Sequence, residues 1–338
     1  MTNAFWVTGP LEGVIREATF DHYPPAIATE ENPAVDVQAL YSGISRGTEA
    51  LVFANRVPES EFQTMRAPFQ EGDFPFPVKY GYSSVGRVTS GPEELAGRSV
   101  FCLFPHQTHY RVPASAVVPL PEGLPEGRAV LAANMETAVN GLWDAAPRIG
   151  DRIAVVGLGV VGLLVAWLAS RIPGTRVTAL DTNPGRRAVA ECLGLDFRTH
   201  CQQDDHDLVI HASGHPAGLE TALGLAGMEA RIVEMSWYGA QTVPLPLGHG
   251  FHSRRLSIRS SQVGHLNPLQ LPRWQYRDRM ALALDLLKDE VLDNLISGES
   301  PFESLPGVMA ALAGVPGSSH AGPIASDSLC HRIVYNRC

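Results

Sequence analysis

The chain has little basic charge and no long apolar run. Its 338 residues include 26 Lys and Arg against 35 Asp and Glu, a net charge of −9 at pH 7. An acidic chain without a basic cluster is not expected to bind nucleic acid or an anionic membrane. No apolar stretch approaches the ~20 residues that cross a bilayer, and no basic segment followed by an apolar one opens the chain. We therefore expect a cytoplasmic protein without a secretory signal.

Cysteine is scarce and scattered. The five cysteines are odd in number and show no CxxC spacing, which favours free thiols in a reducing compartment over a disulfide framework. Charged residues are also few, at 18%, whereas apolar residues reach 45%. This balance excludes intrinsic disorder and supplies two buried cores, and the length itself suggests two domains.

The first 125 residues are predicted to be rich in β-strands. Short segments such as 4–9, 12–20, 34–45 and 83–91 alternate apolar and polar residues and are separated by turn residues. This pattern is typical of antiparallel strands. The first part of the chain should therefore form an irregular, barrel-like antiparallel domain.

The pattern changes after residue 125, where a helix is expected over 127–146. Apolar strands near 153–159, 176–181, 207–214 and 230–237 then alternate with helices, which predicts βαβ units and a parallel sheet. One or two amphipathic helices over 277–297, a loop over 314–328 and a final strand over 328–336 follow. We predict a dinucleotide-binding domain over 126–269 and a second domain made of 1–125 and 270–338.

The strongest motif is a glycine loop, Gly157-Leu158-Gly159-Val160-Val161-Gly162, which directly follows an apolar strand and opens a helix. Its first glycine allows a tight turn, the second lets backbone approach a pyrophosphate, and the third lets helix pack on strand. The next strand ends in Asp181, which can bind ribose hydroxyls and would repel a 2′-phosphate. We therefore predict NAD(H) rather than NADP(H). Arg186 could instead meet such a phosphate, or belong to a solvated helix start.

With these motifs the chain resembles the medium-chain dehydrogenase/reductase family. The local marks are SGISRGTE at 42–49, GYSSVG at 81–86, the helix bearing Glu136 and SSQVG at 260–264. The first two are most similar to bacteriochlorophyllide hydroxyethyl-side-chain dehydrogenases. The resemblance implies an α/β fold, a Rossmann doubly wound parallel sheet inserted into a GroES-like β-barrel domain, with nicotinamide between the domains. It also implies a homodimer joined at sheet edges, to which residues 230–239 and the segment after them could contribute.

The resemblance also implies that segments 236–240 and 260–264 border the nicotinamide. Together with the glycine loop, this assigns a set of residues to the coenzyme: Gly157, Gly159, Val160, Val161, Gly162, Asp181, Arg186, Ser213, Ser236, Trp237, Ser261 and Val263.

Zinc-dependent members of the family carry Cys and His ligands that this chain lacks. Ser45 stands at the Cys position and Tyr82 at the His position, so that only Glu136 remains of the usual set. Zinc needs three good N, S or O⁻ ligands, and hydroxyls of high pKa are poor substitutes. Cys102, His106 and His109 match no ligand spacing. We therefore predict no metal site.

Without a metal, carbonyl chemistry requires hydrogen-bond donors aimed at the developing oxyanion. Tyr82 could donate such a bond and a proton, or simply fill the space of the lost metal. Thr48 takes the place of the family's hydroxyl relay, or is a turn hydroxyl. Glu136 and Arg46 could contact substrate, or be engaged in ion pairs. The candidate catalytic residues are Tyr82, Thr48, Ser45, Glu136 and Arg46, whereas Glu49 is expected to orient the loop and His106 to be an ordinary loop histidine.

The predicted function is zinc-free, NAD(H)-dependent interconversion of a secondary alcohol and a ketone on a small-molecule substrate. By resemblance, the reacting group is a side chain of a planar ring such as a tetrapyrrole or a pterin. Two alternatives stay open: a zinc-free reductase of enones or quinones, and a non-catalytic NAD-binding protein. Product analysis distinguishes the predicted enzyme, which reduces a C=O bond, from the first alternative, which reduces a C=C bond. The second alternative predicts NAD binding without turnover.

Overall fold

The computed structural model describes residues 2–20, 29, 31–314 and 328–336. Two compact units divide the chain: the first comprises residues 1–133 and 284–338, the second residues 134–283. The boundaries predicted from the sequence lie after residues 125 and 269. Most of the loop predicted over 314–328 lies outside the described residues.

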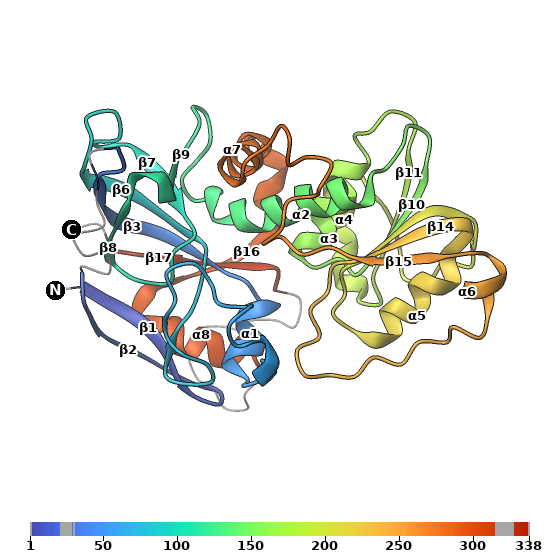
Figure 1. The fold of residues 1–338 in the computed structure, drawn as a ribbon, viewed down its shortest axis with the longest axis horizontal. Coiled ribbons are helices and arrows are strands. Elements are labelled where there is room, and N and C mark those ends of the chain that lie inside the picture. The colour runs from blue at the N-terminus through green and yellow to red at the C-terminus, as the bar shows by residue number, and fades with distance from the viewer. Residues whose placement is uncertain (1, 21–28, 30, 315–327, 337–338) are drawn as a thin grey trace. The chain divides into compact units, whose positions relative to one another are not determined.

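The first unit is built on two sheets (Figure 1). The smaller has the order β2-β1-β5-β4, with β1 (Thr2–Gly9), β2 (Glu12–Ala18), β4 (Glu71–Gly72) and β5 (Val78–Lys79). The larger has the order β16-β17-β3-β6-β7-β9, and β8 (His109–Pro113) also pairs with β3. Its strands are β3 (Ala34–Ile44), β6 (Ser84–Ser90), β7 (Ser99–Cys102), β9 (Val117–Pro119), β16 (Ile296–Pro301) and β17 (Cys330–Val334).

Alternation of apolar and polar residues explains how these strands pack. Along β3, Val35 and Val37 are fully buried, and they join Val100, Tyr110 and Val112 from neighbouring strands in one core cluster. A period of two places such residues on one face of a sheet. The antiparallel domain predicted for the first part of the chain is confirmed.

Short helices complete the first unit. Helix α1 (Thr48–Phe53) follows β3, and α8 (Leu305–Leu312) follows β16. The region predicted as one or two helices over 277–297 contains α7 (Tyr276–Leu286), then a 3₁₀ helix, η6 (Glu290–Leu295), and then the start of β16. The end of that prediction is wrong, because residues 296–301 pair with β17 instead of continuing a helix.

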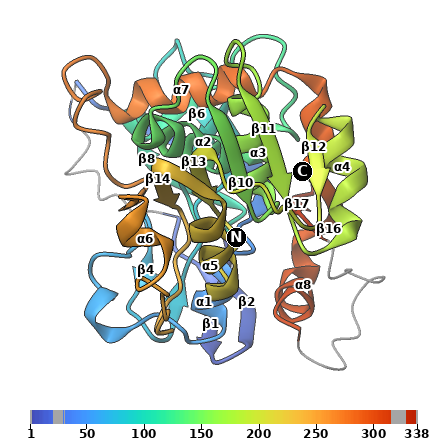
Figure 2. The same cartoon turned by 90° about the vertical axis from the view of Figure 1, so that its right-hand side faces the viewer.

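The second unit holds a six-stranded parallel sheet with the order β12-β11-β10-β13-β14-β15 (Figure 2). The strands are β10 (Arg152–Val156), β11 (Arg176–Leu180), β12 (Asp196–Arg198), β13 (His206–His211), β14 (Ala226–Glu234) and β15 (Ser257–Ser260). This is the 3-2-1-4-5-6 order of a doubly wound sheet, so the predicted fold class is confirmed. Strand β14 pairs with β13 and with β15, so residues 230–234 do not form an edge of the sheet. The edge strand on this side is β15.

Helix α2 (Ala132–Ala145) precedes β10, and the helices between the strands are α3 (Val160–Ala169), α4 (Arg187–Cys192), α5 (Pro216–Leu225) and α6 (Gly250–Ser253). The chain winds from β10 toward β12 and then from β13 toward β15. Right-handed crossovers in opposite directions place α3 and α5 on opposite faces of the sheet. Strand β10 is therefore covered on both sides, which explains why Ile153, Ala154 and Val155 are all fully buried.

The winding direction reverses between β10 and β13, so the carboxyl ends of these two strands form a topological switch point. Ligands of doubly wound sheets bind at this switch point. The glycine loop leaves β10 there, and Ser213 follows β13. Among the described residues, no helix has both the length and the apolarity to traverse a bilayer.

Candidate functional site

The three glycines of the loop differ in what requires them. Gly157 has φ +96°, and a Cβ there would lie 2.4 Å from Ser213 Cα; a Cβ at Gly162 would lie 1.9 Å from the carbonyl oxygen of Gly157. Both glycines are therefore required by packing. A Cβ at Gly159 would meet no protein atom within 4 Å. The open space beside Gly159, at the start of α3, fits the approach of a pyrophosphate to the backbone.

Asp181, directly after β11, is tied to this loop. One carboxylate oxygen accepts a hydrogen bond from Leu158 N at 2.7 Å, and the other accepts from Asn183 N at 2.8 Å. A carboxylate therefore stands beside the glycine loop, where it disfavours a further phosphate. Arg186 is only 8% exposed, so it is not part of a solvated helix start. The exposed Arg187 pairs with Glu191 at 3.3 Å.

The segment over 261–264 is clamped by hydrogen bonds within the second unit. Ser261 N donates to the carbonyl of Glu234 at 2.8 Å, and Ser261 Oγ donates to Asp144 Oδ2 at 2.7 Å. Arg279 Nη2 donates to the carbonyl of Val263 at 2.6 Å. These contacts fix the backbone that the family resemblance assigns to the nicotinamide.

Glu136 is buried and engaged in an ion pair. Its Oε1 accepts from Arg279 Nε at 3.2 Å, and Arg279 Nη1 donates to Asn140 Oδ1 at 2.5 Å. Burial raises the pKa of Glu136, while the guanidinium of Arg279 opposes this rise. Of the alternatives for Glu136, the structure shows the pairing with an arginine.

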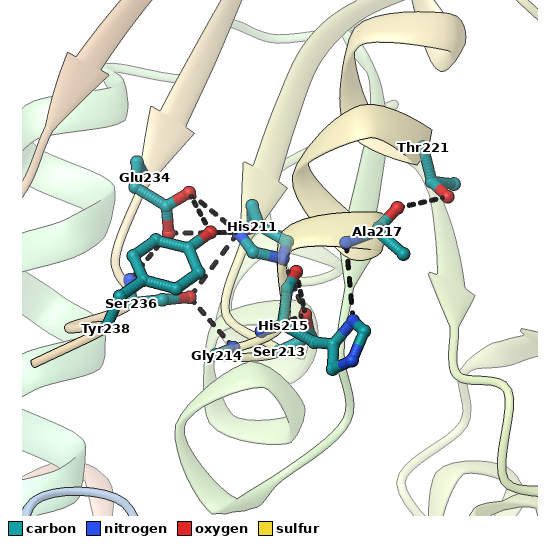
Figure 3. Close-up of polar contacts among 9 residues, drawn as sticks. All are labelled: His211, Ser213, Gly214, His215, Ala217, Thr221, Glu234, Ser236 and Tyr238. Atoms are coloured by element: carbon teal, nitrogen blue, oxygen red, sulfur yellow. Dashed lines mark hydrogen bonds and ion pairs between the residues drawn. The ribbon is translucent and has the colours of Figure 1, made fainter. Parts of the chain in front are cut away.

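Hydroxyl groups gather where β13 and β14 end. Ser213, Ser236 and Tyr238 surround His211 and Glu234 (Figure 3), and Ser236 Oγ accepts from Gly214 N at 3.0 Å. Trp237 lies partly buried between Ser236 and Tyr238 in the same loop. The coenzyme candidates Ser213 and Ser236 therefore belong to one polar cluster.

In the first unit, three candidate catalytic residues lie together. Tyr82 donates a hydrogen bond of 2.6 Å to Ser45 Oγ, and Thr48 also hydrogen-bonds the phenol. Burial, and next the negative charge of Glu49, raise the pKa of Tyr82 to about 12, while the hydrogen bonds with Ser45 and Thr48 oppose this rise. The phenol therefore stays protonated near neutral pH and is a hydrogen-bond donor.

Glu49 connects this cluster to a buried histidine. Its Oε1 accepts from Ser45 N at 2.8 Å, and its Oε2 lies 2.9 Å from His106 Nε2. The other ring nitrogen of His106 lies 2.7 Å from Ser42 Oγ, which in turn lies 2.9 Å from the hydroxyl of Tyr335. His106 is 1% exposed and Glu49 2%. His106 lies in a loop, as expected, and is a buried member of a polar network.

No sequence signal marks this network, because its members are far apart along the chain and belong to no common spacing. The orienting role expected for Glu49 agrees with its bond to the Ser45 backbone. Arg46 Nη1 donates to the carbonyl of Ser328 at 2.9 Å, so a structural contact engages this candidate.

The donor set does not fit a catalytic zinc ion. Ser45 and Tyr82 are neutral hydroxyls bonded to each other, and Glu136 is paired with Arg279. Within residues 2–20, 29, 31–314 and 328–336, no group of three His, Cys, Asp or Glu side chains is arranged to hold a metal ion. Cys102 is buried in β7, where burial raises the pKa of its thiol.

No family model matches the chain. It is similar to L-threonine 3-dehydrogenase from Rhizobium rhizogenes, with 28% identity over 116 residues, 34% of this chain and 33% of the relative. It is also similar to D-guloside 3-dehydrogenase from Escherichia coli, with 26% identity over 203 residues, 55% of this chain and 58% of the relative. The chain thus spans about a third to three fifths of the length of these relatives.

Solved structures match nearly the whole fold. L-idonate 5-dehydrogenase from Escherichia coli has a TM-score of 0.74 at 18% identity, covering 98% of each chain. A zinc-binding dehydrogenase from Sinorhizobium meliloti bound to NADP has a TM-score of 0.74 at 15% identity, covering 99% of each chain. These structures show that the chain has the fold of medium-chain dehydrogenases and reductases. The shared fold agrees with the two kinds of sheet and with the glycine loop at the switch point.

Proposed function

We propose that this chain is an NAD(H)-dependent oxidoreductase that interconverts a secondary alcohol and a ketone without catalytic zinc. The observation that carries the proposal is the glycine loop. Two of its glycines are demanded by protein packing, while Gly159 faces open space at the switch point of a doubly wound sheet. Protein packing does not require a glycine at position 159. A ligand that brings a phosphate close to the backbone explains why Gly159 is there.

The preference for NAD(H) rests on Asp181. Its carboxylate is held beside the glycine loop by two backbone N–H groups. An adenine ribose with free hydroxyls can donate to a carboxylate, whereas a 2′-phosphate would meet a like charge there. One solved structure of this fold is complexed with NADH and another is bound to NADP, so we infer that side chains such as Asp181 set the choice.

The chemistry of the reacting oxygen is assigned to Tyr82, Ser45 and Thr48. When bound, the coenzyme supplies or accepts the hydride. The protonated phenol of Tyr82 can donate to a carbonyl oxygen in place of its bond to Ser45. Ser45 and Thr48 keep the phenol in a hydroxyl network through which a proton can move, and Glu49 holds the Ser45 backbone in place.

The zinc-free mechanism is supported by the donor set, since neither Ser45 nor Tyr82 is an anion near neutral pH. The curated relatives are dehydrogenases named for threonine and sugar acids or sugars. For this chain, the similarity of 42–49 and 81–86 to bacteriochlorophyllide hydroxyethyl-side-chain dehydrogenases favours a 1-hydroxyethyl or keto side chain on a planar ring. We also propose a homodimer, with β15 as the sheet edge available for pairing.

The test is a purified full-length protein, analysed for bound metal and assayed with NAD⁺ and a panel of secondary alcohols, including 1-hydroxyethyl-substituted aromatic rings. NADH formation by metal-free protein, unchanged by chelator, is expected. Stoichiometric zinc whose removal abolishes turnover would contradict the mechanism. Reduction of C=C instead of C=O would favour the enone reductase, and coenzyme binding without turnover the non-catalytic protein.

A further inference from the structure

His211 and Glu234 form a buried pair at the carboxyl ends of β13 and β14. These residues are register partners in the parallel ladder, so their side chains emerge on the same face of the sheet. His211 Nδ1 lies 2.9 and 2.8 Å from the two oxygens of Glu234. The side chain of His211 is 0% exposed and that of Glu234 12%. Figure 3 shows Tyr238 stacked beside the imidazole.

The hydrogen bonds to Glu234 determine which atom donates and which accepts in the contacts from Glu234 through His211 to Ser213. Ser236 N donates to one of its oxygens at 2.7 Å and the Tyr238 hydroxyl donates to the other at 3.0 Å. Burial and the charge of Glu234 raise the pKa of Tyr238, so the phenol keeps this proton. Since the carboxylate accepts from both, His211 Nδ1 must carry a hydrogen toward it. In the neutral imidazole, Nε2 is then the acceptor.

That acceptor faces Ser213, whose Oγ lies 2.6 Å from His211 Nε2 and accepts from His215 N at 3.1 Å. Two glycines enclose the serine. A Cβ at Gly218 would lie 2.3 Å from Ser213 Oγ, and the backbone of Gly157 packs directly against Ser213 Cα. Ser213 is nevertheless exposed. The hydroxyl can donate to His211 Nε2 at 2.6 Å or to the His215 carbonyl at 3.4 Å, and the shorter contact favours the direction toward His211.

A serine, a histidine and a carboxylate in this order are also the parts of an acyl-transfer triad. Such a triad requires free N–H groups for the oxyanion. The N–H groups of Gly214, His215 and Ala217 already donate to Ser236 Oγ, Ser213 Oγ and His215 Nδ1. The geometry therefore favours recognition of a ligand hydroxyl over acyl transfer.

We propose that His211 and Glu234 are positioning residues that hold the Ser213 hydroxyl as the hydrogen-bond partner of a ribose hydroxyl of the bound dinucleotide. The proposal rests on the proposed coenzyme site and deepens it. A dinucleotide bound along the glycine loop passes Ser213, which packs on Gly157. When the Ser213 hydroxyl donates to His211, a lone pair of its Oγ can accept a hydrogen bond from a ribose hydroxyl. Loss of the pair would leave Ser213 in place but free to rotate.

The experiment is a double-mutant cycle on the full-length protein, with dissociation constants for NADH and NAD⁺ measured by titration. Ser213→Ala should weaken binding of both coenzymes by about tenfold, the value of one hydrogen bond. Glu234→Gln should weaken both by severalfold, and the double variant should bind no more weakly than Ser213→Ala alone. Thr221→Ala is the matched control, because this exposed hydroxyl bonds only its own helix, at Ala217 O.

Wild-type affinity in Ser213→Ala, or additive losses in the double variant, would overturn the positioning role. A loss in Glu234→Gln confined to NAD⁺ would also overturn it, since it would reflect attraction to the charged nicotinamide. If Glu234→Gln does not fold, His211→Gln, which keeps an acceptor facing Ser213, replaces it in the cycle with smaller expected losses. A wild-type protein that binds neither coenzyme would overturn the proposed function itself, whereas a binding wild type with an indifferent Ser213 overturns only this inference.

Discussion

The phenol of Tyr82 donates a 2.6 Å hydrogen bond to Ser45 Oγ, and the two residues stand where zinc-dependent members of the superfamily are expected to carry ligands. At the position where zinc-dependent members carry a His ligand, this chain has a Tyr82 phenol that keeps its proton. The negative charge of Glu49, which also bonds the Ser45 backbone, favours the protonated phenol. In the proposed function, the Tyr82 phenol is the donor to the oxygen of a carbonyl substrate.

Removing the Tyr82 hydroxyl should abolish most of the turnover. Tyr82→Phe keeps the ring but deletes the donor, and loss of a general acid costs about 10²–10⁴-fold in rate. The dissociation constant for NADH, measured by titration, should stay within about twofold of wild type. Retention of full kcat would show that Tyr82 only fills space.

The pH dependence of the reaction should lack a tyrosine ionisation near its ordinary value of 10.0. Because the pKa of Tyr82 is raised to about 12, the phenol remains a donor throughout the neutral and moderately alkaline range. Its contribution to folding stability is likewise present below pH 10 and is lost as the pH rises toward 12. A profile of kcat/KM against pH tests the first statement, and a fall assigned to Tyr82 below pH 10 would contradict it.

Two glycine substitutions should separate ligand binding from folding. Gly159→Ala places a methyl group in open space, so its melting temperature should match the wild type while NADH binding falls at least tenfold. Gly162→Ala collides with the Gly157 carbonyl and should lower the melting temperature as well. Calorimetry and coenzyme titration are compared for both variants. Unchanged NADH affinity in Gly159→Ala would contradict the coenzyme site.

Asp181→Ser should relax the coenzyme preference. The substitution removes the negative charge beside the glycine loop but keeps a small polar side chain. Because the like charge no longer opposes a 2′-phosphate, affinity for NADPH should rise about tenfold relative to NADH. The ratio of the two dissociation constants is the measurement, with Asp196→Ser, an exposed position on β12, as the control.

Deleting the buried arginine should destabilise the second unit. Arg279→Met leaves the buried carboxylate of Glu136 unpaired, at a cost of about 3–5 kcal/mol in the free energy of unfolding. Burial already raises the pKa of Glu136, so the loss should grow as the pH rises above the range in which this carboxyl is protonated. The exposed Arg277→Met on the same helix should change stability by less than about 0.5 kcal/mol. Chemical denaturation of both variants provides the comparison, and equal effects would argue against a role of the pair.

Much of the architecture follows from local signals. The strands of the parallel sheet from β10 to β14, apart from β12, lie in segments predicted from apolar runs, and the glycine loop lies between β10 and α3. Strands β12 and β15 were not predicted, because three or four residues are too few to show a periodicity. Strand β16 was not predicted, and its first two residues were assigned to the end of a helix, since its pairing with β17 depends on a strand about 30 residues further along the chain.

The sequence by itself determined the alternation of most strands and helices in the second unit, the place of the glycine loop and the presence of hydroxyl side chains at Ser45 and Tyr82. These features follow from apolar residues that repeat every two residues in strands and every 3.6 in helices, and from motifs of short spacing. The tertiary structure alone decided which ionisable groups meet: His106 with Glu49 across 57 residues, and Glu136 with Arg279 across 143. Buried polar groups must find partners wherever the fold brings them, and no local pattern records that choice.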